Sequence, residues 1–274
     1  MTADSTRLAL GAYLDHLDRE TARFREVLVD AAADTQVPTC PGWNAVDLLW
    51  HLGQVQDFWA RITHGRLQTS DQVQEIEQTR RRPDDRAGVQ AFFDDASRCL
   101  RDALRSTPPE TPAWTWSAEQ TVGFSYRRQA HEALIHRLDA ELTAGADRRP
   151  MDTALAADGI DEALRIMFGG LPEWGSKHSD AGKTFRVEAT DTGHTWLVEL
   201  VRFTGTSPDG TEYDEPDIQV LNTDDGRAVD ATVSGTAVDV DCWMWNRPAI
   251  RQVTVTGDPA VRRSLAAVLG QPIT

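Results

Sequence analysis

The segment QAHEALIHRLDAE carries the side chains best suited to chemistry, with two histidines close to Glu132 and Asp139. Glu132 and His136 are four residues apart, which on a helix of about 100° per residue places them within about 40° on one face. His131 lies about 140° from His136 and is expected on the packing face. Asp139 lies about 20° from Glu132 and can reach the same site. Glu132 and His136 alone form an ordinary helical pair, so a metal site needs a ligand from a second element.

That further candidate is His51, in the segment CPGWNAVDLLWHLGQVQDFWARI. His51 precedes Val55 by four residues and Phe58 by seven, so it lies on the inward stripe of a predicted helix. A buried histidine costs free energy unless both ring nitrogens are satisfied, so His51 is either a hydrogen-bonded core residue or a ligand. A four-helix bundle that turns this stripe toward Glu132 and His136 gathers two imidazoles and one carboxylate. This set suits zinc with an open fourth position, and it also accepts iron, nickel or manganese.

Apolar residues at helical spacing predict helices through about the first 170 residues. Asn44, with Asp47 three residues later, is the expected N-cap of the helix that carries His51. The expected helices cover residues 5–32, 44–62, 89–104, 125–143 and 151–171, and residues 64–86 are expected to form a loop or a short ragged helix. The first part of the chain is therefore predicted to be all helical.

The pattern then changes to strands. Alternating apolar residues on both sides of Asp191-Thr192-Gly193 predict a β-hairpin. Two strand–helix units follow, and Asp258 and Pro259 open the helix of the second unit. We therefore expect an α+β protein in which a helical bundle, residues 1–150, precedes a smaller α+β domain, residues 151–274.

Composition excludes several classes of protein. The chain of 274 residues has a net charge of −15, which argues against general binding to nucleic acid or to membrane surfaces. The sequence has no apolar run long enough to span a membrane and no secretory signal pattern, so the cytoplasm is the expected compartment. Three widely separated cysteines predict neither a disulfide framework nor a zinc knuckle. Only two of the 28 basic residues are lysines, a skew that suggests a GC-rich, actinobacterial coding sequence.

Three segments carry a resemblance to a known family. VPTCPGWNAVDLLWHLGQV and HEALIHRLDAELTAG resemble the mycothiol-dependent maleylpyruvate isomerase family, a branch of the DinB-like metal-binding four-helix proteins. DATVSGTAVDVDCWMWNRPAIRQVTVTGDPAVRRSLAAVL is similar to the second, sterol-carrier-like domain of that family. The resemblance covers residues 6–269 and is thin across 66–86 and 206–217. It implies a divalent metal, usually zinc, held by His51, Glu132 and His136, and it implies mycothiol as the thiol cosubstrate.

The implied chemistry is activation of a thiol. A free thiol with a pKa of about 8.5 is mostly protonated at neutral pH, whereas a zinc ion deprotonates a coordinating thiol. The thiolate can add to an electrophilic carbon. It can then stay attached as an S-conjugate, be exchanged for another thiol, or be expelled after a cis double bond has isomerised. The long segments 66–86 and 106–124 favour a larger acceptor such as a natural-product intermediate, so we expect a mycothiol S-transferase, with a maleylpyruvate-type isomerase as the alternative.

Two other classes of function remain open. A metal-bound hydroxide would make a hydrolase that needs no thiol, with Glu132 or Asp139 handling protons. A non-catalytic binding module would hold the metal structurally and would need a fourth protein ligand, such as Cys40 or Asp139.

Three further residues are predicted to assist. Trp43 is expected to line the cofactor pocket, because its turn leads into the helix that carries His51. Asp139 is a catalytic candidate that can accept a hydrogen bond from a ligating imidazole. Arg247, in WNRP, matches an arginine that the family's second domain contributes, and its planar guanidinium suits an anionic or polyhydroxylated substrate. We expect Arg247 to serve both catalysis and cofactor binding.

Overall fold

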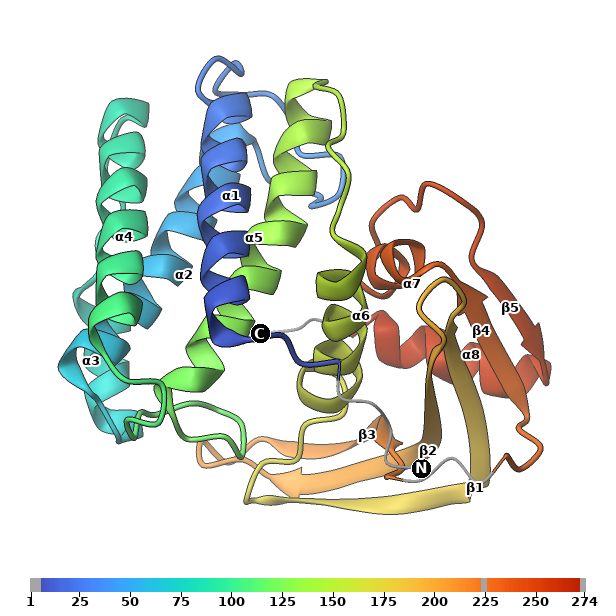
Figure 1. The fold of residues 1–274 in the computed structure, drawn as a ribbon. Helices are drawn as coiled ribbons and strands as arrows, with labels where there is room; N and C mark the ends of the chain where they lie inside the picture. Colours follow the sequence, from blue (N-terminus) through green and yellow to red (C-terminus); the bar gives the residue numbers. More distant parts are fainter. Residues whose placement is uncertain (1–5, 223–225, 272–274) are drawn as a thin grey trace. The chain divides into compact units, whose positions relative to one another are not determined.

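The computed structural model describes residues 6–222 and 226–271. Residues 9–150 form one compact unit, and residues 6–8 together with the chain from Met151 form a second (Figure 1). The chain is thus an α+β protein with an N-terminal helical part and a C-terminal α/β part, as the sequence predicted. No helix in the described ranges is long and apolar enough to cross a bilayer.

The N-terminal unit is a bundle of four long helices and one short helix. In chain order these are α1 (Leu10–Leu28), α2 (Ala45–Gly65), α3 (Ser70–Thr79), α4 (Arg86–Ser106) and α5 (Val122–Ala144). Helix α1 packs on α5, α2 packs on α4, and α2 also contacts α5 (Figure 1). Phe24, Leu48, Leu52 and Phe93 lie in the fully buried core between these helices.

Local sequence explains where α2 begins and ends. The Asn44 side chain accepts hydrogen bonds from the backbone N–H groups of Val46 and Asp47, and the Asp47 carboxylate accepts one from the Asn44 backbone. This capping box fixes the first turn, as predicted. The helix ends at Arg66, which adopts a left-handed conformation with φ of 51°.

Helix α5 is the most thoroughly buried helix of the bundle. It ends where Gly145 takes a left-handed conformation with φ of 61°, which a residue without Cβ adopts without strain. Nearly every residue of α5 is buried, including several charged ones. Such all-round burial is typical of a helix in a core rather than on a surface.

The segment 64–86 was expected to form a loop or a short ragged helix, and it contains the short, regular helix α3. Thr69 and Gln72 form a second capping box there, and Val73 and Ile76 are buried.

The C-terminal unit has a five-stranded sheet with the order β3-β2-β1-β4-β5. Its elements are α6 (Thr153–Glu162), a π-helical turn (Ala163–Met167), β1 (Gly175–Ala189), β2 (His194–Thr206), β3 (Glu212–Val220), β4 (Ala231–Gly235), α7 (Ala237–Met244), β5 (Thr254–Gly257) and α8 (Pro259–Leu269). Strands β1 and β4 are parallel, and the other neighbouring pairs are antiparallel. The expected hairpin joins β1 and β2, with Gly193 at φ of 74° in the turn. Helices α6, α7 and α8 contribute to the core with the sheet.

Candidate metal centre

Helices α2 and α5 bring the three predicted ligands to one point. His51 Nε2 lies 3.2 Å from Glu132 Oε1, and His136 Nε2 lies 3.1 Å from the same oxygen. One ligand atom from each residue lies within 4.8 Å of the others. Among the described residues this is the one group of three or more His, Cys, Asp or Glu side chains found close enough to share an ion. We call it the His–Glu–His cluster.

The donor atoms of the His–Glu–His cluster fit a divalent metal. Two imidazole nitrogens and one carboxylate oxygen are a ligand set that zinc uses at sites with an open position. His136 has its other nitrogen, Nδ1, 2.9 Å from Asp139 Oδ2, which leaves Nε2 directed at the cluster. The His51 and Glu132 side chains retain 25% and 17% of their exposure, so the cluster is reachable from solvent.

The electrostatics of the cluster favour a cation. Burial would raise the pKa of Glu132, but hydrogen bonds from His136 and His51, and the charges of His136 and Arg128, hold that pKa well below its usual range. Burial would likewise lower the pKa of His136, but its contacts with Asp139 and Glu132 raise it to about 9. A carboxylate that stays ionised beside two imidazoles is a site for positive charge. A metal that binds here must displace the proton of His136.

Asp139 lies behind the cluster rather than in it. The carboxylate is fully buried, with Oδ2 accepting from His136 Nδ1 and Oδ1 accepting from Thr39 Oγ1 at 2.5 Å. Cys40 Sγ is 3.9 Å from Oδ2. Such a carboxylate fixes the tautomer and orientation of a metal-ligating imidazole. The geometry therefore supports Asp139 as a positioning residue.

Trp43 covers the imidazoles from the loop before α2. Its ring centroid lies 4.7 Å from that of His51 and 6.5 Å from that of His136. The loop is held by hydrogen bonds from Val37 N to Trp43 O at 2.9 Å and from Ala45 N to Thr35 O at 2.8 Å. Trp43 thus shields one side of the cluster, whereas its contact with a cofactor stays a prediction.

Arg247 follows α7 in the C-terminal unit. Its Nη1 donates to the Trp245 carbonyl at 2.6 Å, and its backbone N–H donates to the Cys242 carbonyl at 2.8 Å. These contacts define the local turn, and a role in catalysis or in binding mycothiol stays a prediction.

The sequence analysis did not single out Arg128 and Thr39. Arg128 Nη2 donates to Glu132 Oε2 at 3.0 Å and leaves Oε1 facing the two imidazoles. Its position four residues before Glu132 is the spacing of a helical ion pair, so the sequence did contain a signal for it. Thr39 has no comparable signal, because its contact with Asp139 spans 100 residues.

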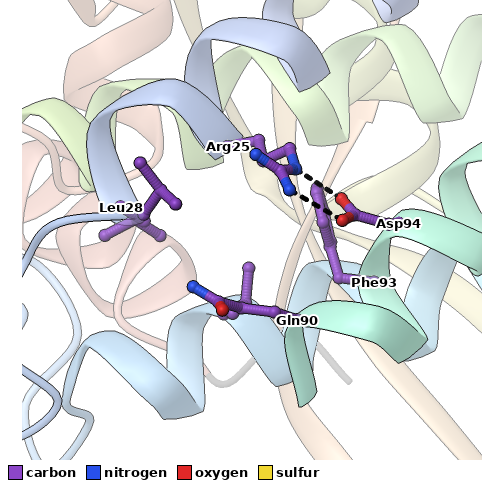
Figure 2. A pocket seen from close by; sticks show the side chains of 7 residues that line it. Arg25, Leu28, Gln90, Phe93 and Asp94 are labelled. Carbon is purple, nitrogen blue, oxygen red and sulfur yellow. Dashed lines mark hydrogen bonds and ion pairs between the residues drawn. The ribbon is translucent and has the colours of Figure 1, made fainter. Parts of the chain in front are cut away.

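The bundle also has a small surface depression (Figure 2). Its lining comes from α1, α2 and α4, and includes Leu28, Leu49 and Phe93. Arg25 and Asp94 form a two-point ion pair beside it, at 2.5 and 2.8 Å (Figure 2). None of the three candidate ligands lines this depression, and its one carboxylate, Asp94, is paired with Arg25.

Comparison with known families agrees with the geometry. Residues 14–141 match the mycothiol maleylpyruvate isomerase N-terminal domain, and residues 154–264 match the MDMPI C-terminal domain. The chain belongs to the mycothiol-dependent maleylpyruvate isomerase family. Family membership supports a mycothiol-dependent enzyme and fits the cluster as a possible metal site.

Two solved structures share the fold. One is the mycothiol-dependent maleylpyruvate isomerase, with a TM-score of 0.55, and the other is a histidine-to-alanine mutant of that isomerase, with a TM-score of 0.56. Each is 14% identical to this chain, and each match covers 92% of this chain and 95% of the other. No curated protein sequence matches this chain.

Proposed function

We propose that this protein is a mycothiol-dependent isomerase that converts the cis double bond of a maleylpyruvate-type substrate to trans. The observation that carries the proposal is the convergence of His51, Glu132 and His136 within a chain whose two halves both match this family. Isomerisation by reversible addition of a thiol consumes neither oxidant nor reductant, because the thiol that adds to the double bond is expelled unchanged.

Each side chain at the cluster has a role in this proposal. A divalent ion held by His51, Glu132 and His136, most readily zinc, would stabilise the thiolate form of mycothiol at neutral pH. Asp139 holds the imidazole of His136 in the tautomer that presents Nε2. Arg128 holds one oxygen of Glu132 and directs the other at the imidazoles.

The family comparison favours isomerisation over the expected S-transfer to a larger acceptor. The preference for transfer depended on the segments 66–86 and 106–124, taken as loops that enlarge a pocket. The first of these contains α3, and the second packs against it, with Trp114 N donating to the Leu67 carbonyl at 2.6 Å and Trp114 Nε1 donating to Ser70 Oγ at 3.2 Å. These ordered contacts remove the structural argument for a large acceptor.

The test is turnover of maleylpyruvate by purified, zinc-loaded protein with and without mycothiol, followed by NMR of the cis and trans isomers. We expect formation of the trans isomer only when mycothiol is present, and no formation by the His51→Ala variant. Turnover of a substrate without any thiol would support the hydrolase alternative instead. Absence of isomerisation, together with a stable mycothiol adduct of an electrophile, would return the assignment to transfer.

A further inference from the structure

Two glutamines in the bundle are completely buried, yet their surroundings differ. The Gln56 amide is satisfied at both ends, because Nε2 donates to Thr21 Oγ1 at 3.1 Å and Oε1 accepts from Ser97 Oγ. Gln129 also has no exposed surface, but neither Nε2 nor Oε1 finds a hydrogen-bond partner within the described part of the chain. A buried amide without partners loses the free energy of its contacts with water and regains nothing from the protein.

Gln129 lies on the same face of α5 as the His–Glu–His cluster. It is three residues before Glu132 and seven before His136, so the three Cβ atoms fall within about 60° around the helix axis. Ser125, four residues before Gln129, lies on this face as well. Glu132 and His136, the two candidate ligands on α5, thus form one stripe along this helix with Gln129 and Ser125.

Ser125 repeats the behaviour of Gln129. It has no exposed surface, and its Oγ has no partner in the described residues. A serine inside a helix usually satisfies its hydroxyl by donating to the carbonyl four residues earlier. Ser125 does not do so, and two adjacent polar groups are therefore left available, each of which can both donate and accept.

We propose that Gln129 and Ser125 form a hydrogen-bonding subsite for the amide next to the thiol of mycothiol, an inference that depends on the proposed function. Mycothiol carries its sulfur on an acylated cysteine, so an amide lies only a few bonds from the sulfur. At about 1.5 Å of rise per residue, Gln129 lies about 4.5 Å along the helix axis from Glu132 and Ser125 lies about 10.5 Å from it, so Gln129 is the nearer partner for an amide a few bonds from the sulfur. The Gln129 amide can donate to and accept from an amide at two points, and Ser125 adds a third contact.

The subsite also accounts for why the fold tolerates two unpartnered polar groups. Gln129 and Ser125 are desolvated when the protein folds, so a ligand that pairs with them does not have to strip water from them. A site built in this way discriminates strongly against a thiol that lacks the matching amide. The free energy lost in folding is regained when the ligand binds.

The test is the Gln129→Met variant, which replaces the amide with an apolar side chain of similar size. We expect the midpoint of thermal unfolding to rise by about 2–4 °C, because an unsatisfied buried amide is removed. We expect the Kd of mycothiol for the zinc-loaded protein, measured by calorimetry, to weaken about tenfold, because one partner of the ligand amide is lost. Binding of 2-mercaptoethanol, a thiol without an amide, should be the same in wild type and variant.

Two further variants serve as a control and as a second test in the same protein. Gln56→Met should lower the unfolding midpoint, because it strips partners from Thr21 and Ser97, and should leave the Kd of mycothiol unchanged. Ser125→Ala makes a smaller change than Gln129→Met and should act in the same direction on both measurements.

Either of two results would overturn the inference. Unchanged mycothiol affinity in both Gln129→Met and Ser125→Ala would mean that enclosed water alone serves these groups. A Gln129→Met variant as destabilised as Gln56→Met would mean that the amide has protein partners in solution. If isomerase turnover is normal and the affinity for mycothiol is unchanged in the variants, only the subsite is refuted. If binding of the thiol depends on its amide but no isomerisation occurs, only the proposed function is refuted. A wild-type protein that does not bind mycothiol contradicts both.

Discussion

Helix α5 carries two networks of buried charged side chains, and the neighbouring residues His136 and Arg137 belong to different networks. His136 belongs to the His–Glu–His cluster, whereas Arg137 Nε donates to Glu20 at 2.8 Å and Arg137 Nη1 donates to Glu141 at 2.7 Å. The Arg137, Glu20 and Glu141 side chains keep between zero and 6% of their exposure. Both networks pair buried carboxylates with nitrogen-bearing side chains. The carboxylates of the Arg137 network contact guanidinium groups, whereas Glu132 contacts two imidazoles as well as Arg128.

The difference teaches which buried polar groups can hold a metal. Arginine keeps its proton at every ordinary pH and has no lone pair to offer, so Arg137 can only neutralise the carboxylates around it. Imidazole can lose its proton and present a lone pair to a metal. A helix turns about 100° between His136 and Arg137, which directs one side chain to a site and the other to a closed ion-pair network.

The largest effect is expected from breaking the cluster at its carboxylate. Glu132→Gln keeps the size of the side chain but removes the charge that both imidazoles face. We expect kcat/KM for mycothiol-dependent isomerisation to fall by more than about 100-fold. This is more than the loss of about 10- to 100-fold that is usual when a residue supporting a metal ligand is replaced, because Glu132 is itself a proposed ligand. Steady-state kinetics measures this, and a loss of less than tenfold would remove Glu132 from the site.

The Arg137 network is expected to respond in stability instead. Arg137→Met removes one cation from each of the buried carboxylates of Glu20 and Glu141, which keep Arg19 and Arg23 as partners, so we expect a cost of about 3 kcal/mol in the free energy of unfolding, the lower end for a broken buried pair. Urea denaturation measures the loss. As a control, replacing Glu20 and Glu141 by Leu in the same variant should restore most of the stability. The zinc content of folded Arg137→Met should equal that of wild type, and a loss of zinc would mean that the two networks are coupled.

An intermediate effect is expected at Asp139, which contacts Nδ1 of His136, the ring nitrogen that does not face Glu132. Asp139→Asn can no longer hold His136 in the required tautomer, so zinc affinity should fall about 10- to 100-fold. Competition with a chromophoric chelator measures this affinity. Thr39→Val, which removes only the hydrogen bond to the other carboxylate oxygen, should change zinc affinity much less. Equal effects of the two substitutions would argue against a special role for the His136 contact.

The smallest effect is expected at a buried carboxylate without histidine neighbours. Asp239, in the C-terminal unit, accepts from Thr236 Oγ1 at 2.6 Å and from the backbone N–H groups of Ile250 and Arg251 at 2.7 and 2.9 Å. Burial would raise its pKa, but these hydrogen bonds lower it below the usual range. Asp239 therefore stabilises the fold fully above its unfolded pKa of about 3.9, and this contribution disappears as the pH falls through the lower folded value.

Asp239→Asn should accordingly cost about 1 kcal/mol at pH 7, and the cost should shrink as the pH falls below about 3.9. Thermal unfolding of the variant and wild type across this pH range checks the prediction. A difference between the two proteins that grows as the pH falls would contradict the assigned sign.

The sequence predicted the cluster because its residues lie on two helices with strong local signals. The capping box at Asn44 and the apolar stripe through His51 fixed α2, and the four-residue spacing fixed Glu132 against His136. Helix α3 was expected only as one alternative to a loop, because Val73 and Ile76 are its only two buried residues and the rest of the segment is polar. Strand β3 was missed because Pro216 and several acidic residues interrupt its alternation.

The remaining features depend on contacts between distant segments. That Gln129 lacks partners while Gln56 has two depends on which side chains of α1 and α4 face each amide, and no local pattern contains this. The same holds for Thr39, which meets Asp139 only in the folded bundle.

The most direct test of the account is the zinc content of wild type and of the His51→Ala variant, measured by mass spectrometry after loading and dialysis. The account predicts about one equivalent in wild type and below about 0.1 in the variant, because two ligands from a single helix do not hold the ion. Circular dichroism should show both proteins equally helical. Full zinc occupancy in the folded variant would contradict the claim that α2 and α5 share a metal.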